Sequence, residues 1–263
     1  MSVIAYWRTA VAAPALLILA GCATIPAEDR HPDDPWESYN RAVFEFNESL
    51  DEAVLRPAAV QYRRLPQPVR TGVGNFFAYL DDFTVLVNNL LQGKLHNAAS
   101  DTSRIMFNTS FGLFGLIDVA SLMGLDKNNE DFGQTLGRWG VGSGPYFQIP
   151  VLGPSTVRDA PARLVDARLN PLNHSTLRDD RQELWFGLRV VELIDTRAGL
   201  IATEDMLEQI SDDPYIAMRQ AYLQRRDFLV RDGEPDGADA DAMLDELEAL
   251  EALEAMEPGE TAD

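Results

Sequence analysis

The stretch IMFNTSFGLFGLIDVASLMGL, residues 105–125, decides the fold because it sets large apolar side chains on nearly every side of a helix and carries a single charge, Asp118. A helix that is apolar all round is normally buried, either in a protein core or in lipid. The uncharged part, Ile105 to Ile117, spans 13 residues. As a helix it is about 20 Å long, too short for a hydrocarbon layer of about 30 Å. Two interpretations remain: the central helix of a soluble bundle, or a helix embedded in one leaflet of a membrane.

The rest of the chain predicts an all-α fold. Apolar residues at helical spacing predict helices over residues 34–55, 69–92, 98–122, 157–166, 181–200 and 211–230. Asp34 with Pro35, and Asp213 with Pro214, have the order of an N-cap and a first helical residue, while Gly93 suits a helix stop. Residues 128–155 are dense in glycine and proline and predict an ordered loop or hairpin.

The N-terminus predicts export and lipidation. Residues 1–21 combine Arg8, an apolar core and small residues, as a signal peptide does. Leu19 to Cys22 reads LAGC, which resembles a bacterial lipobox, so we predict lipidation of Cys22 and an acylated tether over residues 22–33. Several acyl chains anchor a protein stably where one is marginal. An ordinary signal peptide with an incidental cysteine is the alternative, and Ala23 after the cysteine favours the outer membrane of a Gram-negative bacterium.

Composition excludes several classes of protein. The 263 residues are 46% apolar, which is enough for a substantial core. With 42 acidic and 22 basic residues the net charge is −20, which opposes binding to nucleic acid. The single cysteine excludes an intrachain disulfide. Residues 232–263 carry no basic residue and predict an acidic, flexible tail, with a short docking helix as the alternative.

No motif in the chain indicates catalysis. There is no nucleophile elbow, zinc-binding helix, phosphate-binding loop or dinucleotide fingerprint. His31, His96 and His174 lie in separate segments without the spacing of metal ligands. We therefore expect no catalytic residue, no metal, no cofactor and no enzymatic activity.

Five motifs carry a family resemblance. They are DPWESYNRAVFEFN at 34–47, NNLLQGK at 88–94, NTSFGLFGLIDVA at 108–120, DFGQTLGRWGVGSGPYFQIPVLGPSTVRD at 131–159 and DPYIAMRQAYLQRRDFLV at 213–230. With them, residues 34–231 resemble the MlaA (VacJ) family of outer-membrane lipoproteins. The resemblance implies a ring or horseshoe of amphipathic helices lying in one membrane leaflet, the periplasmic leaflet of the outer membrane, around an amphipathic channel.

The resemblance also implies a function. Such a protein removes mislocalised phospholipids from the outer leaflet and passes them to a soluble periplasmic lipid carrier, in association with a porin trimer. Moving a lipid breaks no covalent bond, but a charged headgroup crosses hydrocarbon at high cost unless a polar path is provided. The alternative is a periplasm-facing lipoprotein scaffold without a membrane-inserted channel.

Two groups of residues are candidates for this function. The resemblance implies a gating loop at Gly140, Gly142, Gly144, Pro145 and Tyr146, for which a rigid turn is the alternative. The candidate lipid-facing residues are Phe76, Phe77, Phe107, Phe111 and Phe114. Phe83 and Phe114 depart from the family pattern, which has proline and glycine there, so a kink at the first and a close helix approach at the second are in doubt.

Overall fold

The computed structural model describes residues 31–174, 180–210 and 213–234. The elements in chain order are α2 (Glu37–Leu50), the π-helix η2 (Asp51–Leu55), α3 (Arg56–Tyr62), α4 (Gln67–Leu91), α5 (Leu95–Ser110), α6 (Val119–Leu122), α7 (Phe132–Arg138), β1 (Tyr146–Ile149), β2 (Gly153–Thr156), α8 (Asp159–Leu169), the 3-10 helix η3 (Pro171–Asn173), α10 (Gln182–Ile210) and α11 (Pro214–Val230). The predicted signal peptide, Cys22, most of the tether and the tail from residue 235 lie outside these residues. The predicted all-α class is confirmed, with a two-stranded hairpin added.

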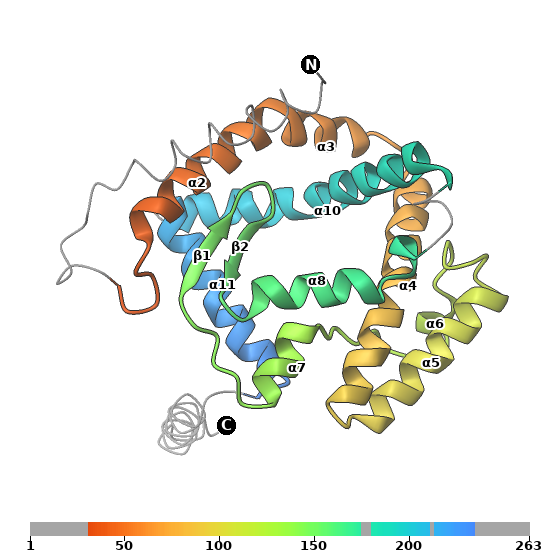
Figure 1. Ribbon diagram of the computed structural model, residues 1–263. Coiled ribbons are helices and arrows are strands. Elements are labelled where there is room, and N and C mark those ends of the chain that lie inside the picture. The colour runs from red at the N-terminus through yellow and green to blue at the C-terminus, as the bar shows by residue number, and fades with distance from the viewer. Residues whose placement is uncertain (1–30, 175–179, 211–212, 235–263) are drawn as a thin grey trace, which may run out of the picture.

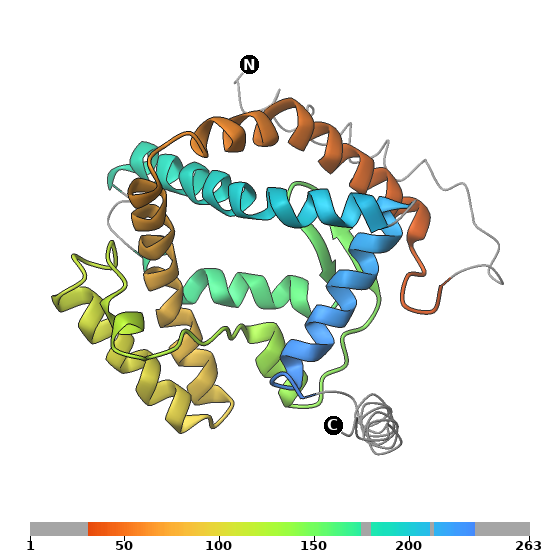
Figure 2. The ribbon, with the colours of Figure 1, turned by 180° about the vertical axis from the view of Figure 1, so that it is seen from behind.

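The helices follow one another around a ring in Figure 1. Helices α2 and α3 form the top, α4 the right side, α8 the lower edge and α11 the left side, while α10 runs beneath α2 and α3. Figure 2 shows the same ring from behind, with α5 outside it against α4 and α6 against α5. No helix among the described residues is both long enough and apolar enough to cross a membrane.

The start of the domain is tied to its end by a buried carboxylate. Asp34 does not cap α2 as predicted, since the N-cap is Trp36, which makes no side-chain cap. Instead Asp34 is fully buried and accepts hydrogen bonds from Asn40 Nδ2 at 2.6 Å, Arg219 at 2.8 Å and the Tyr215 hydroxyl. Three donors satisfy a buried carboxylate better than a cap would, so tertiary contacts decide its position.

Helices α4 and α5 form an antiparallel pair on a small core. Phe77, Tyr79 and Leu80 from α4 pack with Leu172 of η3. Helix α4 ends as predicted, with Gly93 at a positive φ of 75°. Helix α5, in contrast, ends at Ser110, so the prediction of one helix over 98–122 was wrong. The residues that follow turn back on α5 instead of continuing it.

The glycine-rich segment contains the predicted hairpin and one helix, α7, that was not predicted. Strands β1 and β2 are antiparallel, with Tyr146 opposite Thr156 and Ile149 opposite Gly153. The free edge of β1 is covered by α2 through two asparagines. Asn40 accepts from Gln148 N at 2.8 Å and donates to Tyr146 O at 3.3 Å. Asn47, two turns later, accepts from Val151 N at 2.7 Å and donates to Ile149 O at 3.1 Å.

Candidate functional site

The first candidate site is the turn at residues 111–125, which we call the apolar turn. Leu113, Phe114 and Gly115 all have positive φ angles, of 53°, 56° and 87°. Left-handed backbone is uncommon for bulky residues and is found where surrounding contacts enforce it. Here the backbone N–H of Gly115 donates to the carbonyl of Asn108 at 3.0 Å, which folds the chain back over the end of α5.

Polar side chains hold the apolar turn from the inside. Asn108 donates to Asp118 Oδ1 at 3.0 Å and accepts from the backbone N–H of Ala120 at 3.0 Å. Arg104, which is buried, donates to Asp118 Oδ2 at 3.0 Å. Partial burial by itself would raise the pKa of Asp118, but the hydrogen bonds from Ser121, Asn108 and Arg104 outweigh it and lower this pKa to about 2. Asp118 is therefore an anion at neutral pH and a fixed anchor for the turn.

The apolar side chains of this turn point outward as a consequence. The exposed ones are Phe111, Leu113, Phe114, Leu116, Ile117, Leu122 and Met123. Leu122 keeps 82% of its surface exposed, and Phe111 and Phe114 keep 68% and 67%. Exposed large apolar side chains gathered in one short segment mark a surface that contacts another apolar phase or partner.

The five candidate lipid-facing phenylalanines fall into two environments. Phe111 and Phe114 are exposed on the apolar turn, and Phe107 is half-buried and stacks on Phe111 with ring centroids 6.3 Å apart. Phe76 packs against Phe77 at 5.3 Å, and Phe77 is 6% exposed in the core beneath α4. We therefore keep Phe107, Phe111 and Phe114 in the lipid-facing proposal and leave out Phe76 and Phe77.

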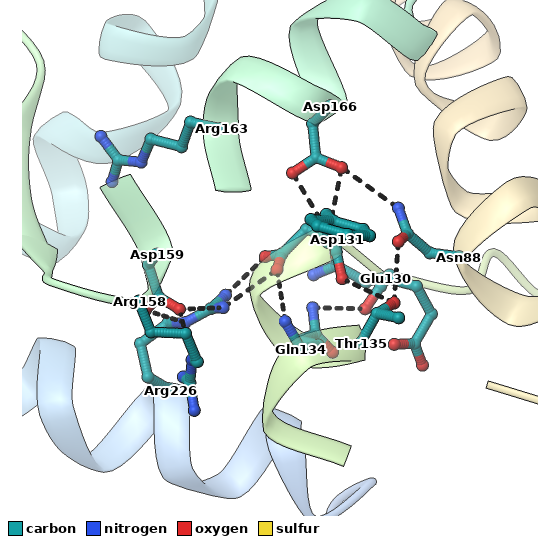
Figure 3. Close-up of polar contacts among 12 residues, drawn as sticks. Asn88, Glu130, Asp131, Gln134, Thr135, Arg158, Asp159, Arg163, Asp166 and Arg226 are labelled. Atoms are coloured by element: carbon teal, nitrogen blue, oxygen red, sulfur yellow. Dashed lines mark hydrogen bonds and ion pairs between the residues drawn. The ribbon is translucent and has the colours of Figure 1, made fainter. Parts of the chain in front are cut away.

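The second candidate site is a cluster of ionised side chains inside the ring, drawn in Figure 3, which we call the polar junction. At its centre Arg226 of α11 joins two carboxylates from different elements. It contacts Asp131, the N-cap of α7, at 2.5 and 2.9 Å, and Asp159, the first residue of α8, at 2.9 and 3.2 Å. Arg158 also donates to Asp159, at 2.8 Å. Three helices that are distant in sequence therefore meet on one guanidinium.

The carboxylates of the polar junction differ in pKa. Burial acts to raise the pKa of Asp131 and Asp159, but the hydrogen bonds and positive charge of the arginines outweigh it and lower both. Burial and the negative charge of Asp131 raise the pKa of Asp166 to about 6. Asp166 accepts from the backbone N–H of Phe132 at 3.0 Å and from Asn88 Nδ2 at 3.1 Å. It is the group of this cluster that titrates nearest to neutral pH.

The candidate gating loop borders a cavity beside the polar junction. Gly140 and Gly142 line this cavity of about 510 Å³, with Arg158 and Arg226 among its other walls. Gly140 and Gly144 have positive φ angles of 89° and 65°, which suit glycine. Tyr146, the last of the five candidate residues, is instead fully buried in β1. The structure thus brings the glycines next to two arginines whose charges are paired with Asp131 and Asp159.

Sequence reasoning missed the polar junction. Asp131 could have been found as a cap before α7, because it is followed by a helix-compatible run. Nothing in the local sequence pointed to Arg226 or Asp159, since Arg226 lies 95 residues from Asp131 and 67 residues from Asp159 in the chain. Arginines neutralise carboxylates of this cluster, and within the described ranges no group of three His, Cys, Asp or Glu side chains is arranged to hold a metal ion.

Comparison with known proteins gives consistent results. A sequence model of the family described as MlaA lipoprotein matches residues 32–229. The chain is 37% identical over 238 residues to the intermembrane phospholipid transport system lipoprotein MlaA of Shigella flexneri and to that of Escherichia coli K12, covering 88% of this chain and 92% of each relative. A chain from the solved structure described as the structural basis for maintenance of bacterial outer membrane lipid asymmetry is 38% identical, with a TM-score of 0.65, covering 75% of this chain and 98% of the other.

Proposed function

The chain belongs to the MlaA lipoprotein family, and we therefore propose that it removes mislocalised phospholipids from the outer leaflet of the outer membrane and passes them to a periplasmic lipid carrier. Its relatives are named as lipoproteins of an intermembrane phospholipid transport system. The observation that carries the proposal within this chain is the apolar turn, where seven large apolar side chains face outward over a polar interior. The proposed activity is transport without catalysis.

The proposed location is the periplasmic leaflet of the outer membrane. Cys22, which lies outside the described residues, would carry the acyl chains, and residues 22–33 would tether them to the ring. The apolar turn is suited to the acyl layer, because burying each large apolar side chain contributes about 1.5–3 kcal/mol. A ring lying in one leaflet needs no membrane-spanning helix, and the described helices are consistent with that arrangement.

The proposed path for lipid lies inside the ring. Charged headgroups need polar partners there, and the cavity beside the glycine-rich loop offers polar side chains, Ser143, Gln224 and Asp227 among them. We propose that Gly140, Gly142 and Gly144 let this loop move and gate the path. We propose further that a porin trimer holds the ring in the membrane and that a soluble carrier accepts the lipid on the periplasmic side.

Deleting the protein from its own cell tests the function. Phospholipid exposed in the outer leaflet should rise, and restoring the wild-type chain should reverse the rise. A Cys22→Ser chain should fail to be processed and localised, and should restore little. An unchanged outer leaflet in the deletion strain would contradict the proposed role.

Two further experiments separate the finer parts of the proposal. Purified protein lacking acyl chains should still need detergent if the ring is inserted in lipid, whereas a periplasm-facing scaffold would be soluble and monomeric. Cross-linking Gly142→Cys to a cysteine placed on α11 across the shared cavity should block transport if the loop is a gate. Full transport in the locked form would remove the loop from the mechanism.

A further inference from the structure

The corner where α3 leads into α4, residues 60–70, concentrates positive charge in an acidic chain, and we call it the basic corner. The whole chain has a net charge of −20, yet residues 53–80 contain four arginines and no acidic residue. Three of these arginines, Arg63, Arg64 and Arg70, lie in the corner. In Figure 1 the corner lies where α3, at the top of the ring, meets α4, on its right side. A cationic surface of this kind attracts a partner with negative charge.

The arginines of the basic corner are available to such a partner. Arg63 and Arg64 are exposed, and Arg70 is half-buried, with its Nε donating to a backbone carbonyl of the same corner at 3.2 Å. None of the three forms an ion pair with any residue in the described part of the chain. Asp195 of α10, which contacts α3 here, accepts from the Tyr62 hydroxyl at 2.7 Å. Arg63 and Arg64 therefore keep their N–H donors for a partner outside the ring.

Apolar side chains are interspersed with these arginines. Val60, Leu65 and Val69 are all exposed, and they belong to the same short segment. Arginines beside exposed apolar residues are typical of segments that lie at a membrane surface, where the guanidinium groups reach the headgroups and the apolar side chains meet the acyl boundary. The composition of the corner therefore favours a lipid surface as the negatively charged partner.

The basic corner continues into the apolar turn. Asn75 Nδ2 donates to the carbonyl of Leu116 at 3.3 Å, and a Cβ added at Gly72 would lie 3.5 Å from the same oxygen. The first turns of α4 therefore lie against the apolar turn. Arg70 precedes Asn75 by five residues, which is about 8 Å along a helix. The headgroup region extends roughly 5–8 Å beyond the hydrocarbon on each side of a bilayer, so the corner reaches the headgroups when the apolar turn lies among acyl chains.

We propose that the basic corner binds anionic headgroups of the leaflet that surrounds the ring, and so fixes the depth and tilt of the ring. Arg63 and Arg64 contact the phosphate oxygens, and Leu65 rests at the acyl boundary. These lipids stay outside the ring and are not the transported ones. The attraction is electrostatic, so salt weakens it. The inference rests on the membrane location in the proposed function and adds to it a second contact with a preference for anionic lipid.

Photo-cross-linking from the protein tests the inference. The full-length lipoprotein, with benzoylphenylalanine in place of Leu65, is reconstituted in vesicles of phosphatidylethanolamine that contain a minor fraction of phosphatidylglycerol, and the lipid adducts are identified by mass spectrometry. We expect the phosphatidylglycerol adduct to exceed its share of the vesicle lipid roughly fivefold, which corresponds to about 1 kcal/mol at about 1.4 kcal/mol per tenfold. Combining Arg63→Gln with Arg64→Gln should return the adducts to the vesicle composition, and so should high salt.

Two controls accompany the measurement. Benzoylphenylalanine in place of Leu122, which is exposed on the apolar turn, should give adducts that follow the vesicle composition, with or without the arginine substitutions. Arg225→Gln, at an exposed position of α11, should leave the enrichment at position 65 unchanged. Enrichment that persists without Arg63 and Arg64 would overturn the inference. Lipid adducts at position 122 without enrichment at position 65 would overturn it too, leaving the membrane location standing and an acidic protein as the alternative partner. Absence of lipid adducts at both positions would overturn the membrane location as well.

Discussion

Gly115 lies where the apolar turn passes over α4, and at this position both backbone angle and space demand glycine. Its φ is 87°, and an added Cβ would be 2.4 Å from Cβ of Tyr79. Gly124, near the end of the same turn, has a similar φ of 79° but nothing within 4 Å of an added Cβ. The two glycines therefore separate the cost of the backbone angle from the cost of the clash.

Gly115→Ala should destabilise the protein more than Gly124→Ala does. We expect a loss of about 1 kcal/mol for the angle in each variant, and an additional loss of about 1–3 kcal/mol from the overpacking in Gly115→Ala. Denaturant unfolding in detergent measures the difference. Equal losses for the two variants would show that the turn does not press on α4.

Asp166 makes the stability of the polar junction depend on pH. Its pKa of about 6 is raised above the ordinary value of 3.8 by burial and by Asp131. The folded state therefore binds this proton more tightly than the unfolded state does. Below about pH 4 the Asp166 carboxyl is protonated in both states, and its burial costs little stability. As the pH rises to about 6 the carboxyl ionises first in the unfolded state, so the folded state loses stability.

Asp166→Asn should gain stability relative to wild type as the pH rises from 4 to 6.5. The asparagine keeps an oxygen for the N–H of Phe132 and removes the titration. A shift from 3.8 to about 6 limits the relative gain to about 3 kcal/mol. Unfolding of both proteins across this range provides the test, and a constant difference between them would contradict the assignment.

At the scale of elements, α2 forms hydrogen bonds with the backbone of the hairpin, as a neighbouring strand would. Asn40 gives the edge of β1 one donor and one acceptor. Asn47, on the same face of the helix, donates to Ile149 at the end of β1 and accepts from Val151 in the turn. Val151, in the hairpin turn, has a φ of 70°, an outlier for a β-branched residue. Asn47 accepts from the N–H of this residue and donates to the carbonyl of Ile149, so it holds the strained turn in place.

Asn47→Ala should therefore free the hairpin turn. Losing the acceptor of the Val151 N–H should raise the hydrogen-exchange rate of that amide about tenfold, since a typical hydrogen bond contributes about 0.5–1.5 kcal/mol. Asn47→Asp keeps this acceptor and should raise the rate less. Glu45→Ala, an exposed position on the same helix, is the control. Unchanged exchange in Asn47→Ala would mean that β2 alone holds the turn.

At the scale of the whole molecule, the ring is closed by polar contacts between segments far apart in sequence. Arg226 joins α11 to α7 and α8, and Asp34 joins the start of the domain to α11. A thin ring has few positions that are buried on all sides, and paired charges lie at several of them. Removing one partner of a buried ion pair leaves the charge of the other uncompensated, which lowers the stability of the fold.

Arg226→Met should destabilise the ring strongly, by about 3–5 kcal/mol, because Asp131 and Asp159 lose their shared partner. Arg225→Met removes the same charge from the exposed neighbouring position and should cost little. Chemical denaturation of the two variants makes the comparison. A small loss in Arg226→Met would show that the helices of the ring are held mainly by other contacts.

Much of this organisation was predictable from local sequence. Helical spacing located most helices, Asp213 caps α11 by accepting from the N–H groups of Tyr215 and Ile216, and Gly93 stops α4. The glycine-rich segment contains the predicted hairpin. These features depend on residues within a few positions of one another, so the chain determines them without reference to its neighbours in space.

The errors occurred where distant segments compete with local preference. The run after Ser110 has the composition of a helix, yet Asn108 and Asp118 hold it as a turn with its apolar side chains outward. Asp34 has the sequence position of an N-cap, but in the structure it accepts a hydrogen bond from Arg219 instead. By itself, the sequence determined most of the helices, the hairpin, the family and the presence of a strongly apolar stretch after Ser110. Only the tertiary structure decided which of those residues face outward, and which charges meet inside the ring, because both depend on partners far away in the chain.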